Sequence, residues 1–187
     1  MDIIQGKDFT YNNTCVTIGK FDGIHIGHRR ILEKVIELSK QYCYKSTVFT
    51  FDFDYFKSPD EKRLNTRDEK IKLLEEFGID ILVDYPFDEE TKNMTPEKFV
   101  KDILIKKLGV RAMVVGENFR FGRGAEGNVS TLDELGVKYE FKVYPMKLVE
   151  YAGSMVSSTR IREELNVGHM KEAFEMLNKT SDSMYNK

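Results

Sequence analysis

Two histidines stand three positions apart in G-K-F-D-G-I-H-I-G-H, a stretch that runs from Gly19 to His28. The chain has only three histidines, so two of them in one loop indicate a shared task. An imidazole nitrogen can donate or accept a hydrogen bond and can become cationic near neutral pH, which suits contact with a polyphosphate. Glycine at positions 19, 23 and 27 lets the backbone approach a ligand closely. We therefore predict that this histidine loop, residues 19–28, binds phosphate rather than serving only as a polar helix start.

The elements on either side of the loop are predicted to position it. The apolar run T-C-V-T-I-G over 14–19 is typical of a buried strand. The helix expected over 28–42 has an apolar stripe at helical spacing, formed by Ile31, Val35, Leu38 and Tyr42 and widened by Leu32 and Ile36. A helix N-terminus presents unpaired N–H groups that favour phosphate. The histidines should thus lie between the carboxyl end of a strand and the N-terminus of a helix.

The pattern Gly-x-Phe-Asp-x-x-His-x-Gly-His resembles the nucleotidylyltransferase superfamily. The tetrapeptide H-I-G-H is also typical of class I aminoacyl-tRNA synthetases. That alternative is disfavoured because the 187 residues include no K-M-S-K-S-like segment and leave no room for an anticodon-reading domain.

A second polar group, the serine–arginine turn, follows much later as V-S-S-T-R-I-R over 156–162. Its hydroxyls belong to Ser157, Ser158 and Thr159 and can cap a helix, while Arg160 offers a planar fork that matches phosphate oxygens. Taken alone, the turn is equally consistent with an ordinary N-cap and a solvent-facing arginine pair. Together with the histidine loop, it predicts the second half of an ATP site.

The rest of the chain alternates between strand and helix patterns. We expect strands at 46–53, 80–85, 111–116 and 138–144, a hairpin within 147–156, and helices at 67–77, 96–108, 130–135, 158–166 and 170–178. Such alternation indicates an α/β fold with a mostly parallel sheet and helices on both faces, which binds ligands at the carboxyl ends of its strands. We predict a single domain over 1–187 with a frayed tail at 180–187.

Composition excludes several classes of partner. Apolar residues make up 41% of the chain, charged residues 32%, and the formal net charge is −2. A general nucleic-acid or membrane-surface binder usually has a basic excess, so we expect neither partner. The sequence has no apolar run near the roughly 20 residues of a membrane span and no signal-peptide pattern at its start. We therefore expect a cytoplasmic protein, and the sequence leaves its oligomeric state open.

The glycines at 122, 124 and 127 spell G-x-G-x-x-G, the fingerprint of dinucleotide-binding loops. That fingerprint requires the glycines directly after a strand and an acidic residue about 20 positions later. Here residues 117–121 intervene and the stretch 145–148 has no acid. The dinucleotide hypothesis is therefore disfavoured.

Five segments together give a more specific resemblance. They are the histidine loop, R-L-N-T-R-D-E-K (63–70), T-P-E-K-F-V (95–100), V-G-E-N-F-R-F-G-R-G-A-E-G-N (115–128) and S-S-T-R-I-R-E-E-L (157–165). In content and order they resemble the FMN adenylyltransferase module of bacterial FAD synthetases. The resemblance implies a Rossmann-like nucleotidylyltransferase fold and transfer of AMP from ATP to FMN, giving FAD and pyrophosphate. In that family the module is commonly fused to a riboflavin kinase domain, which would begin where this chain ends, so we expect a standalone enzyme supplied with FMN.

The resemblance also implies roles for particular residues. The catalytic set is His25, His28, Asn118 and Arg160. The ATP set is Gly19, Lys20, Phe21, Asp22, Gly23, Gly27, Gly116, Ser157, Ser158 and Thr159. The FMN set is Phe51, Phe53, Arg63, Phe119, Phe121 and Arg123, with Arg67 as a further candidate for the FMN phosphate. Mg²⁺ is the expected cofactor, held mainly by substrate phosphates.

For some of these residues an alternative stays open. Asp22 is as consistent with fixing the loop as with binding ATP, and Lys20 with pointing to solvent. Phe119 and Phe121 are equally consistent with walling a flavin and with packing the core.

The chain departs from the family after its second predicted strand. The family usually has Phe-x-Pro-His-Pro there, whereas this chain has Phe51 followed by D-F-D-Y over 52–55. The lost prolines allow a looser loop, and Asp54 places negative charge where a second anion approaches. Two alternatives therefore remain beside FMN adenylyltransferase: a nucleotidylyltransferase for another phosphomonoester, and a non-catalytic flavin- or nucleotide-binding regulator.

Overall fold

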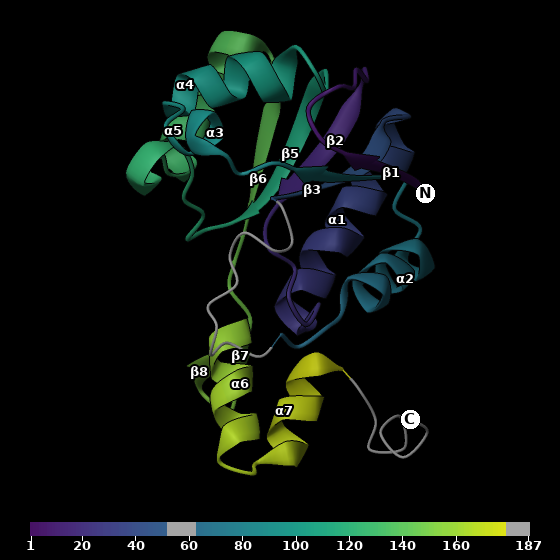
Figure 1. Ribbon diagram of the computed structural model, residues 1–187, viewed down its shortest axis with the longest axis vertical. Coiled ribbons are helices and arrows are strands. Elements are labelled where there is room, and N and C mark those ends of the chain that lie inside the picture. The colour runs from purple at the N-terminus through teal and green to yellow at the C-terminus, as the bar shows by residue number, and fades with distance from the viewer. Residues whose placement is uncertain (52–62, 179–187) are drawn as a thin grey trace.

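Six strands form one parallel sheet in the computed structural model, which describes residues 1–51 and 63–178 (Figure 1). The strands are β1 (Asp2–Gln5), β2 (Thr14–Ile18), β3 (Lys45–Phe51), β4 (Ile81–Tyr85), β5 (Val110–Gly116) and β6 (Lys142–Met146). Their order is β1-β4-β3-β2-β5-β6, and every neighbouring pair is parallel. The expected α/β fold with a mostly parallel sheet is confirmed.

Helices cover both faces of the sheet because successive strand residues point to opposite sides. On one face lie α1 (Ile26–Tyr42) and α2 (Arg67–Phe77), which pack with Cys15, Val48 and Ala112. On the other face lie α4 (Pro96–Phe99), the π-helical segment η1 (Val100–Ile105) and α5 (Val129–Tyr139), which pack with Val16, Phe49 and Met113. The short helix α3 (Glu89–Lys92) precedes α4 and the 3₁₀ turn η2 (Arg123–Ala125) precedes α5.

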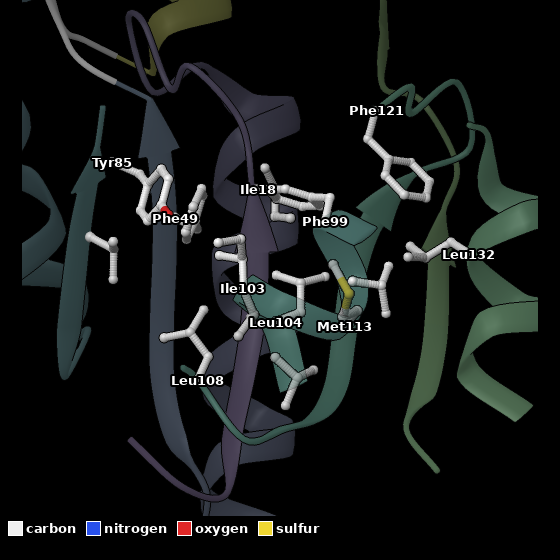
Figure 2. Packing of buried hydrophobic residues seen from close by; sticks show 14 of the residues in the cluster. Ile18, Phe49, Tyr85, Phe99, Ile103, Leu104, Leu108, Met113, Phe121 and Leu132 are labelled. Carbon is white, nitrogen blue, oxygen red and sulfur yellow. The ribbon is translucent and has the colours of Figure 1, made fainter. Parts of the chain in front are cut away.

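The second of these cores becomes aromatic toward the carboxyl ends of the strands. Figure 2 shows Phe49, Tyr85 and Phe99 packed together, with Phe121 beyond them. The ring centroids of Phe49 and Tyr85 are 5.3 Å apart, and those of Phe49 and Phe99 are 5.9 Å apart in an edge-on arrangement. Phe99 and Phe121 of this aromatic core also line a cavity at the candidate site.

The C-terminal elements form a small unit beyond the carboxyl ends of the strands (Figure 1). It consists of the hairpin β7 (Glu150–Tyr151) and β8 (Ser154–Met155) and the helices α6 (Ser158–Asn166) and α7 (Met170–Leu177). Its own apolar cluster includes Val156, Ile161 and Met176, and Leu64 and Ile26 pack against it. The unit therefore rests on the segments that surround the start of α1.

The strand order places a switch point between β2 and β5. From β2 the chain proceeds outward to β3 and β4, and it then crosses to β5 and β6 on the other side of β2. In sheets of this kind a crevice opens at the carboxyl ends of the two strands where the order reverses. Gly19 follows β2 and Gly116 ends β5, so the loops that carry the predicted site residues lie at this crevice.

Several element predictions were correct to within two residues, and others were wrong. The helix expected at 130–135 runs from Val129 to Tyr139, so the strand expected at 138–144 begins only at Lys142. Residues 137–141 have a β-like composition, but the first three of them continue helix α5. Leu132 and Leu135 bury one face of this helix, and Val137 lies on its exposed face with 82% of the residue accessible. Tyr42, expected in the apolar stripe of α1, is exposed. The predicted tail at 180–187 lies outside the described residues.

Candidate active site

Two adjoining cavities open at the switch point. The polar cavity, of about 340 Å³, is lined by both the histidine loop and the serine–arginine turn. The aromatic cavity, of about 520 Å³, lies on the other side of Ile18, Gly19 and Phe119, which line both. Each volume is within the usual range for small-molecule sites. Two ligands bound in the two cavities would meet at this shared edge.

The histidine loop presents both of its imidazoles to the polar cavity. His25 is the N-cap of α1, and its Nδ1 accepts a hydrogen bond of 3.3 Å from the backbone N–H of His28. Because Nδ1 accepts, the proton of a neutral His25 must be on Nε2. The two rings stack with centroids 3.7 Å apart and planes 16° apart. A Cβ on Gly27 would stand 3.1 Å from Cε1 of His25, so the glycine makes room for this ring.

Both histidines are neutral at pH 7, contrary to the expectation of cations near neutral pH. Burial lowers the pKa of His25 to about 4, although the Asp22 carboxylate opposes the shift. Burial also holds the pKa of His28 well below its usual value, and the electrostatic influence of His25 and Lys70 acts in the same direction. The pair therefore offers neutral N–H donors to a ligand, and charge must come from other groups.

The loop that carries the histidines has a strained backbone. Phe21 has φ +49° and Ile24 has φ +39°, and both side chains are buried. A left-handed conformation is unfavourable for residues other than glycine, and most of all for a β-branched residue such as isoleucine. Such strain costs on the order of 1–3 kcal/mol per residue and persists only where the surroundings hold it.

Asp22 supplies part of that support. Its Oδ1 accepts hydrogen bonds from the backbone N–H groups of Leu64 (3.0 Å) and Asn65 (3.4 Å), and its Oδ2 lies 2.6 Å from Nη2 of Arg162. The Asp22 carbonyl oxygen accepts a further bond of 2.7 Å from Oγ of Ser158. Asp22 is absent from the described residues that line the polar cavity. Of its two possible roles, the geometry favours fixing the loop.

The serine–arginine turn meets the histidine loop through its hydroxyl residues. Ser157 is the N-cap of α6, and its Oγ accepts a bond of 3.1 Å from the backbone N–H of Arg160. Ser157, Ser158 and Thr159 all line the polar cavity. The two halves of the predicted ATP site, more than a hundred residues apart in sequence, thus line one cavity. Gly116 and Asn118, in the segment after β5, line it as well.

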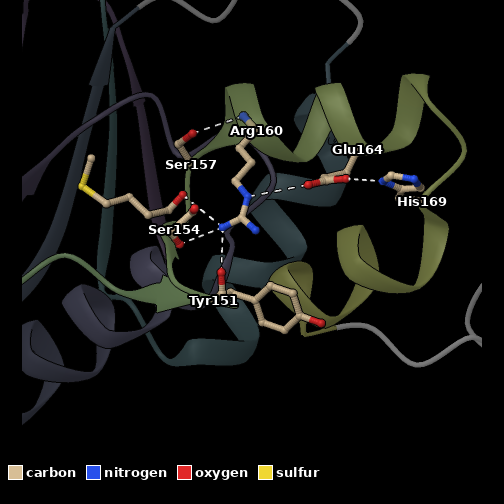
Figure 3. Close-up of polar contacts among 7 residues, drawn as sticks. Tyr151, Ser154, Ser157, Arg160, Glu164 and His169 are labelled. Atoms are coloured by element: carbon tan, nitrogen blue, oxygen red, sulfur yellow. Dashed lines mark hydrogen bonds and ion pairs between the residues drawn. The ribbon is translucent and has the colours of Figure 1, made fainter.

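The side chain of Arg160 points to the β7–β8 hairpin (Figure 3). Its Nη1 donates to the carbonyl oxygens of Tyr151 (2.9 Å), Ser154 (2.7 Å) and Met155 (3.4 Å) in the β7–β8 hairpin. Its Nε lies 3.7 Å from Glu164, whose other oxygen is 2.8 Å from Nδ1 of His169. Among the described residues that line the two cavities, Arg160 does not occur. The structure therefore does not bring the guanidinium to the histidines, and its phosphate role stays a prediction.

The aromatic cavity is walled by phenylalanines from separate segments. Phe119 and Phe121 stack with centroids 5.5 Å apart and planes 12° apart, while Phe51 meets Phe87 edge-on at 4.9 Å. Phe99 completes the wall from α4. Phe121 is also part of the buried core, and its role in walling a flavin stays a prediction.

Comparison with known proteins agrees with this geometry. The family model described as FAD synthetase matches residues 7–160, which is most of the chain. The chain belongs to the FAD synthetase family.

Its relatives in this family include longer proteins. The bifunctional riboflavin kinase/FMN adenylyltransferase of Buchnera aphidicola subsp. Schizaphis graminum is 35% identical over 157 residues, which cover 81% of this chain and 50% of the relative. The FAD synthetase of Listeria monocytogenes is 32% identical over 166 residues, covering 87% and 67%. This chain spans about half the length of the first of these relatives.

A solved structure supports the fold alone. The crystal structure of a macrolide-efflux protein from Streptococcus pneumoniae has a TM-score of 0.81 and 24% sequence identity, with 96% of this chain and 60% of that chain covered. The similarity extends over nearly the whole chain and supports the expected α/β fold with a parallel sheet.

Several residues assigned from the FAD synthetase resemblance lie elsewhere than expected. Lys20 lines the aromatic cavity rather than the polar one. Gly23 has φ +86°, and a Cβ there would stand 2.7 Å from Cδ1 of Leu64, so packing and backbone conformation require this glycine. Gly19, Phe21 and Gly27 line the polar cavity as predicted.

The cations expected for the FMN phosphate do not line the aromatic cavity. Arg123 lies 3.8 Å from Glu126, and Arg67 lies 3.6 Å from Asp84. Arg63 is also absent from the described residues that line the aromatic cavity. Phe53, which was assigned to FMN binding, lies outside the residues that the structure describes. The described cationic side chains in the lining are Lys20, Lys92 and Arg120.

Sequence reasoning missed Phe87, Lys92 and Arg120 at this cavity. Phe87 and Lys92 follow the carboxyl end of β4, a position that could have marked them. Arg120 lies between Phe119 and Phe121, which were assigned to FMN binding, but no role was predicted for Arg120 itself.

Two of the three G-x-G-x-x-G glycines, Gly122 and Gly127, serve packing. A Cβ on Gly122 would stand 2.8 Å from Cγ of Pro96, and one on Gly127 would stand 2.8 Å from the Phe121 ring. Phe121 and Gly127 also form an antiparallel bridge. The glycines thus allow the chain to turn back beneath the aromatic cavity.

Within 1–51 and 63–178, no group of three histidine, cysteine, aspartate or glutamate side chains is arranged to hold a metal ion. Over the same residues, no helix has both the length and the apolar character needed to cross a membrane.

Proposed function

We propose that this chain transfers AMP from ATP to FMN, releasing pyrophosphate and forming FAD. The observation that carries the proposal is the pair of adjoining cavities with a shared edge at Ile18, Gly19 and Phe119. One cavity offers hydroxyls, imidazoles and a helix N-terminus, which suit a polyphosphate. The other offers parallel aromatic rings, which suit a flat flavin. Membership of the FAD synthetase family supports the same pairing.

In the proposed reaction an oxygen of the FMN phosphate attacks the α-phosphorus of ATP. The new P–O bond forms as the bond between the α-phosphorus and the bridging oxygen breaks, and that electron pair leaves with pyrophosphate. A phosphate monoester is already about doubly ionised at neutral pH, so no general base is required. The obstacle is repulsion, since two unit charges 4 Å apart repel by about 4 kcal/mol at an effective dielectric of about 20.

The proposed role of the polar cavity is to offset this repulsion with oriented donors. Nε2–H of His25 and the His28 imidazole would donate to phosphate oxygens, together with the N-terminus of α1. Asn118 would act as a neutral donor and acceptor at the boundary between the two substrates. Mg²⁺ would enter with the ATP phosphates and supply positive charge there, which is compatible with a described site that has no carboxylate cluster.

Arg160 would join the site only after a change of side-chain conformation. Its guanidinium must leave the hairpin carbonyls and Glu164 before it can contact a triphosphate. Its neighbours Ser157 and Thr159 already line the cavity, so we expect rotation about side-chain bonds to bring the guanidinium within reach.

The test is an assay of purified protein with ATP, Mg²⁺ and FMN, monitored for FAD and pyrophosphate by chromatography. We expect equal amounts of FAD and pyrophosphate with FMN and no adenylylated product with riboflavin. Pyrophosphate release with phosphopantetheine or a polyol phosphate, but not with FMN, would contradict the proposal and assign another phosphomonoester.

A second candidate is a regulator that binds flavin or nucleotide without turnover. The orientation of Arg160 away from the polar cavity favours it. Binding of FMN and ATP by calorimetry, with no FAD formed over hours at high protein concentration, would support this candidate over the enzyme.

A further inference from the structure

Lys70 is a buried lysine behind the histidine loop. It lies in the first turn of α2, and only 3% of the residue is exposed. Lysine is almost never buried to this extent unless its ammonium has a partner. The Nζ of Lys70 donates a hydrogen bond of 2.6 Å to the carbonyl oxygen of Lys20, fifty residues earlier in the chain.

The Lys20 carbonyl oxygen that accepts this bond belongs to the strained turn of the histidine loop. Lys20 stands between Gly19, which lines both cavities, and Phe21, whose φ is +49°. Asp22 is held on the other side of the same turn by Leu64, Arg162 and Ser158. The strained turn is therefore fixed from two sides, by Asp22 and by the ammonium of Lys70.

Electrostatics keep the ammonium charged in this setting. Burial lowers the pKa of Lys70 to about 8, with contributions from the charges of Arg63 and Arg67, while the carboxylates of Asp84 and Asp22 oppose the shift. A group with that pKa is mostly protonated at pH 7. A charged donor forms a stronger hydrogen bond to a carbonyl than a neutral one does.

We propose that Lys70 is a positioning residue for adenylyl transfer: it holds the Lys20 carbonyl and so sets where His25 and His28 stand in the polar cavity. This inference rests on the proposed function, because the rate it affects is that of the AMP transfer. A displacement of about 1 Å in a reacting geometry can lower a rate by roughly a hundredfold. Gly19 and Lys20 line the aromatic cavity too, but its phenylalanine walls come from other segments, so flavin binding should depend on Lys70 much less.

The experiment compares Lys70→Met with Lys72→Met. Methionine keeps an unbranched apolar stem but cannot donate to the Lys20 carbonyl, whereas Lys72 is an exposed neighbour on the same helix. We expect Lys70→Met to lower kcat by about 10- to 100-fold, with the Kd for FMN, measured by flavin fluorescence, within about threefold of wild type. Lys72→Met should leave both values unchanged, and Lys70→Arg should recover part of kcat.

The proposal is overturned if Lys70→Met retains the wild-type kcat, or if kcat and FMN binding fall together in proportion to the folded fraction. Should Lys70→Met not fold, Lys70→Leu, which likewise cannot donate a hydrogen bond, takes its place with the same expectation. Failure of both to fold would show a purely structural role and would also overturn the proposal.

Amide hydrogen exchange separates this claim from the proposed function. If the wild-type chain forms no FAD, the proposed function fails, yet the positioning claim is still tested. We expect Lys70→Met to speed exchange in residues 20–28 by about tenfold while β3 and α5 are unchanged. Unaltered exchange in that segment would contradict the positioning role.

Discussion

The two halves of the polar cavity differ in how completely the structure prepares them. In the histidine loop both predicted imidazoles reach the cavity, and a strained backbone is held by Asp22 and Lys70. In the serine–arginine turn the hydroxyl residues reach the cavity, but the Arg160 guanidinium is bound to the hairpin.

The difference follows from side-chain length. A capping histidine or serine is confined to within a few ångströms of its own backbone, so the local turn decides where it points. An arginine reaches much farther, and its destination depends on which acceptors the tertiary structure offers. Here three carbonyl oxygens and Glu164 are those acceptors. We infer that one half is ready for phosphate and the other must rearrange.

We expect the largest loss of activity from a substitution in the histidine loop. His28→Ala should lower kcat by about 10²- to 10³-fold, the usual loss when one oriented donor is removed, while the Kd for FMN stays within about threefold. The control is His169→Ala, which removes the exposed histidine of the other half and should leave kcat within about twofold. Equal losses of kcat and FMN affinity in His28→Ala would contradict its assigned role.

The buried histidines also predict a pH dependence of stability. Because the pKa of His25 is about 4 in the folded chain and about 6.5 when unfolded, the unfolded chain takes up a proton first as the pH falls. Stability is therefore full above pH 6.5 and declines toward pH 4, by about 2 kcal/mol at pH 5 from His25 alone. His28 acts in the same direction.

Urea unfolding at pH 7.5 and pH 5 measures this decline. His25→Asn keeps a good N-cap residue and should lose about 2 kcal/mol less than wild type between the two pH values. An identical decline in the variant would show that His25 is not held neutral.

Asp22 joins the two halves and should give a smaller effect. Asp22→Asn keeps one oxygen acceptor for Leu64 and Asn65 but removes the charge that pairs with Arg162. We expect about a tenfold loss of kcat and a loss of about 1–3 kcal/mol in unfolding free energy, since the pair is largely buried. A loss of ATP affinity without any change in stability would instead favour direct contact with ATP.

Glu164→Gln should give the smallest effect and in the opposite direction. It weakens the hold on the Arg160 Nε, which is 3.7 Å from Glu164, and leaves the hairpin carbonyls in place. If Arg160 must turn toward ATP, the KM for ATP should fall by about two- to threefold. A KM that rises would indicate that Glu164 orients Arg160 for its task.

Much of the fold and part of the site could be predicted from the sequence. Apolar patterning and caps located β2, α2 and α6 to within a residue, because local preference and packing agree there. The strand start at Lys142 was missed because burial of one face of α5 overrode a β-like composition. The four-residue edge strand β1, mostly exposed, gave no clear apolar pattern.

At the site, the short side chains next to turns lie at the polar cavity and the long ones do not, while the roles of both stay predictions. Gly19, His25, His28 and Ser157 line the polar cavity as predicted. Arg160 instead donates to hairpin carbonyl oxygens that only the folded chain brings within reach, and Arg123 lies near Glu126, three residues later. Lys70 was missed because burial of a lysine leaves no trace in a helix that is otherwise charged.

A crystal structure with Mg²⁺ and a non-hydrolysable ATP analogue tests the shared polar cavity most directly. We predict a triphosphate between the histidine pair and the Ser157–Thr159 backbone, with the Arg160 guanidinium turned from the hairpin carbonyls to a phosphate oxygen. A nucleotide bound elsewhere, or one that contacts only one of the two halves, would contradict the account.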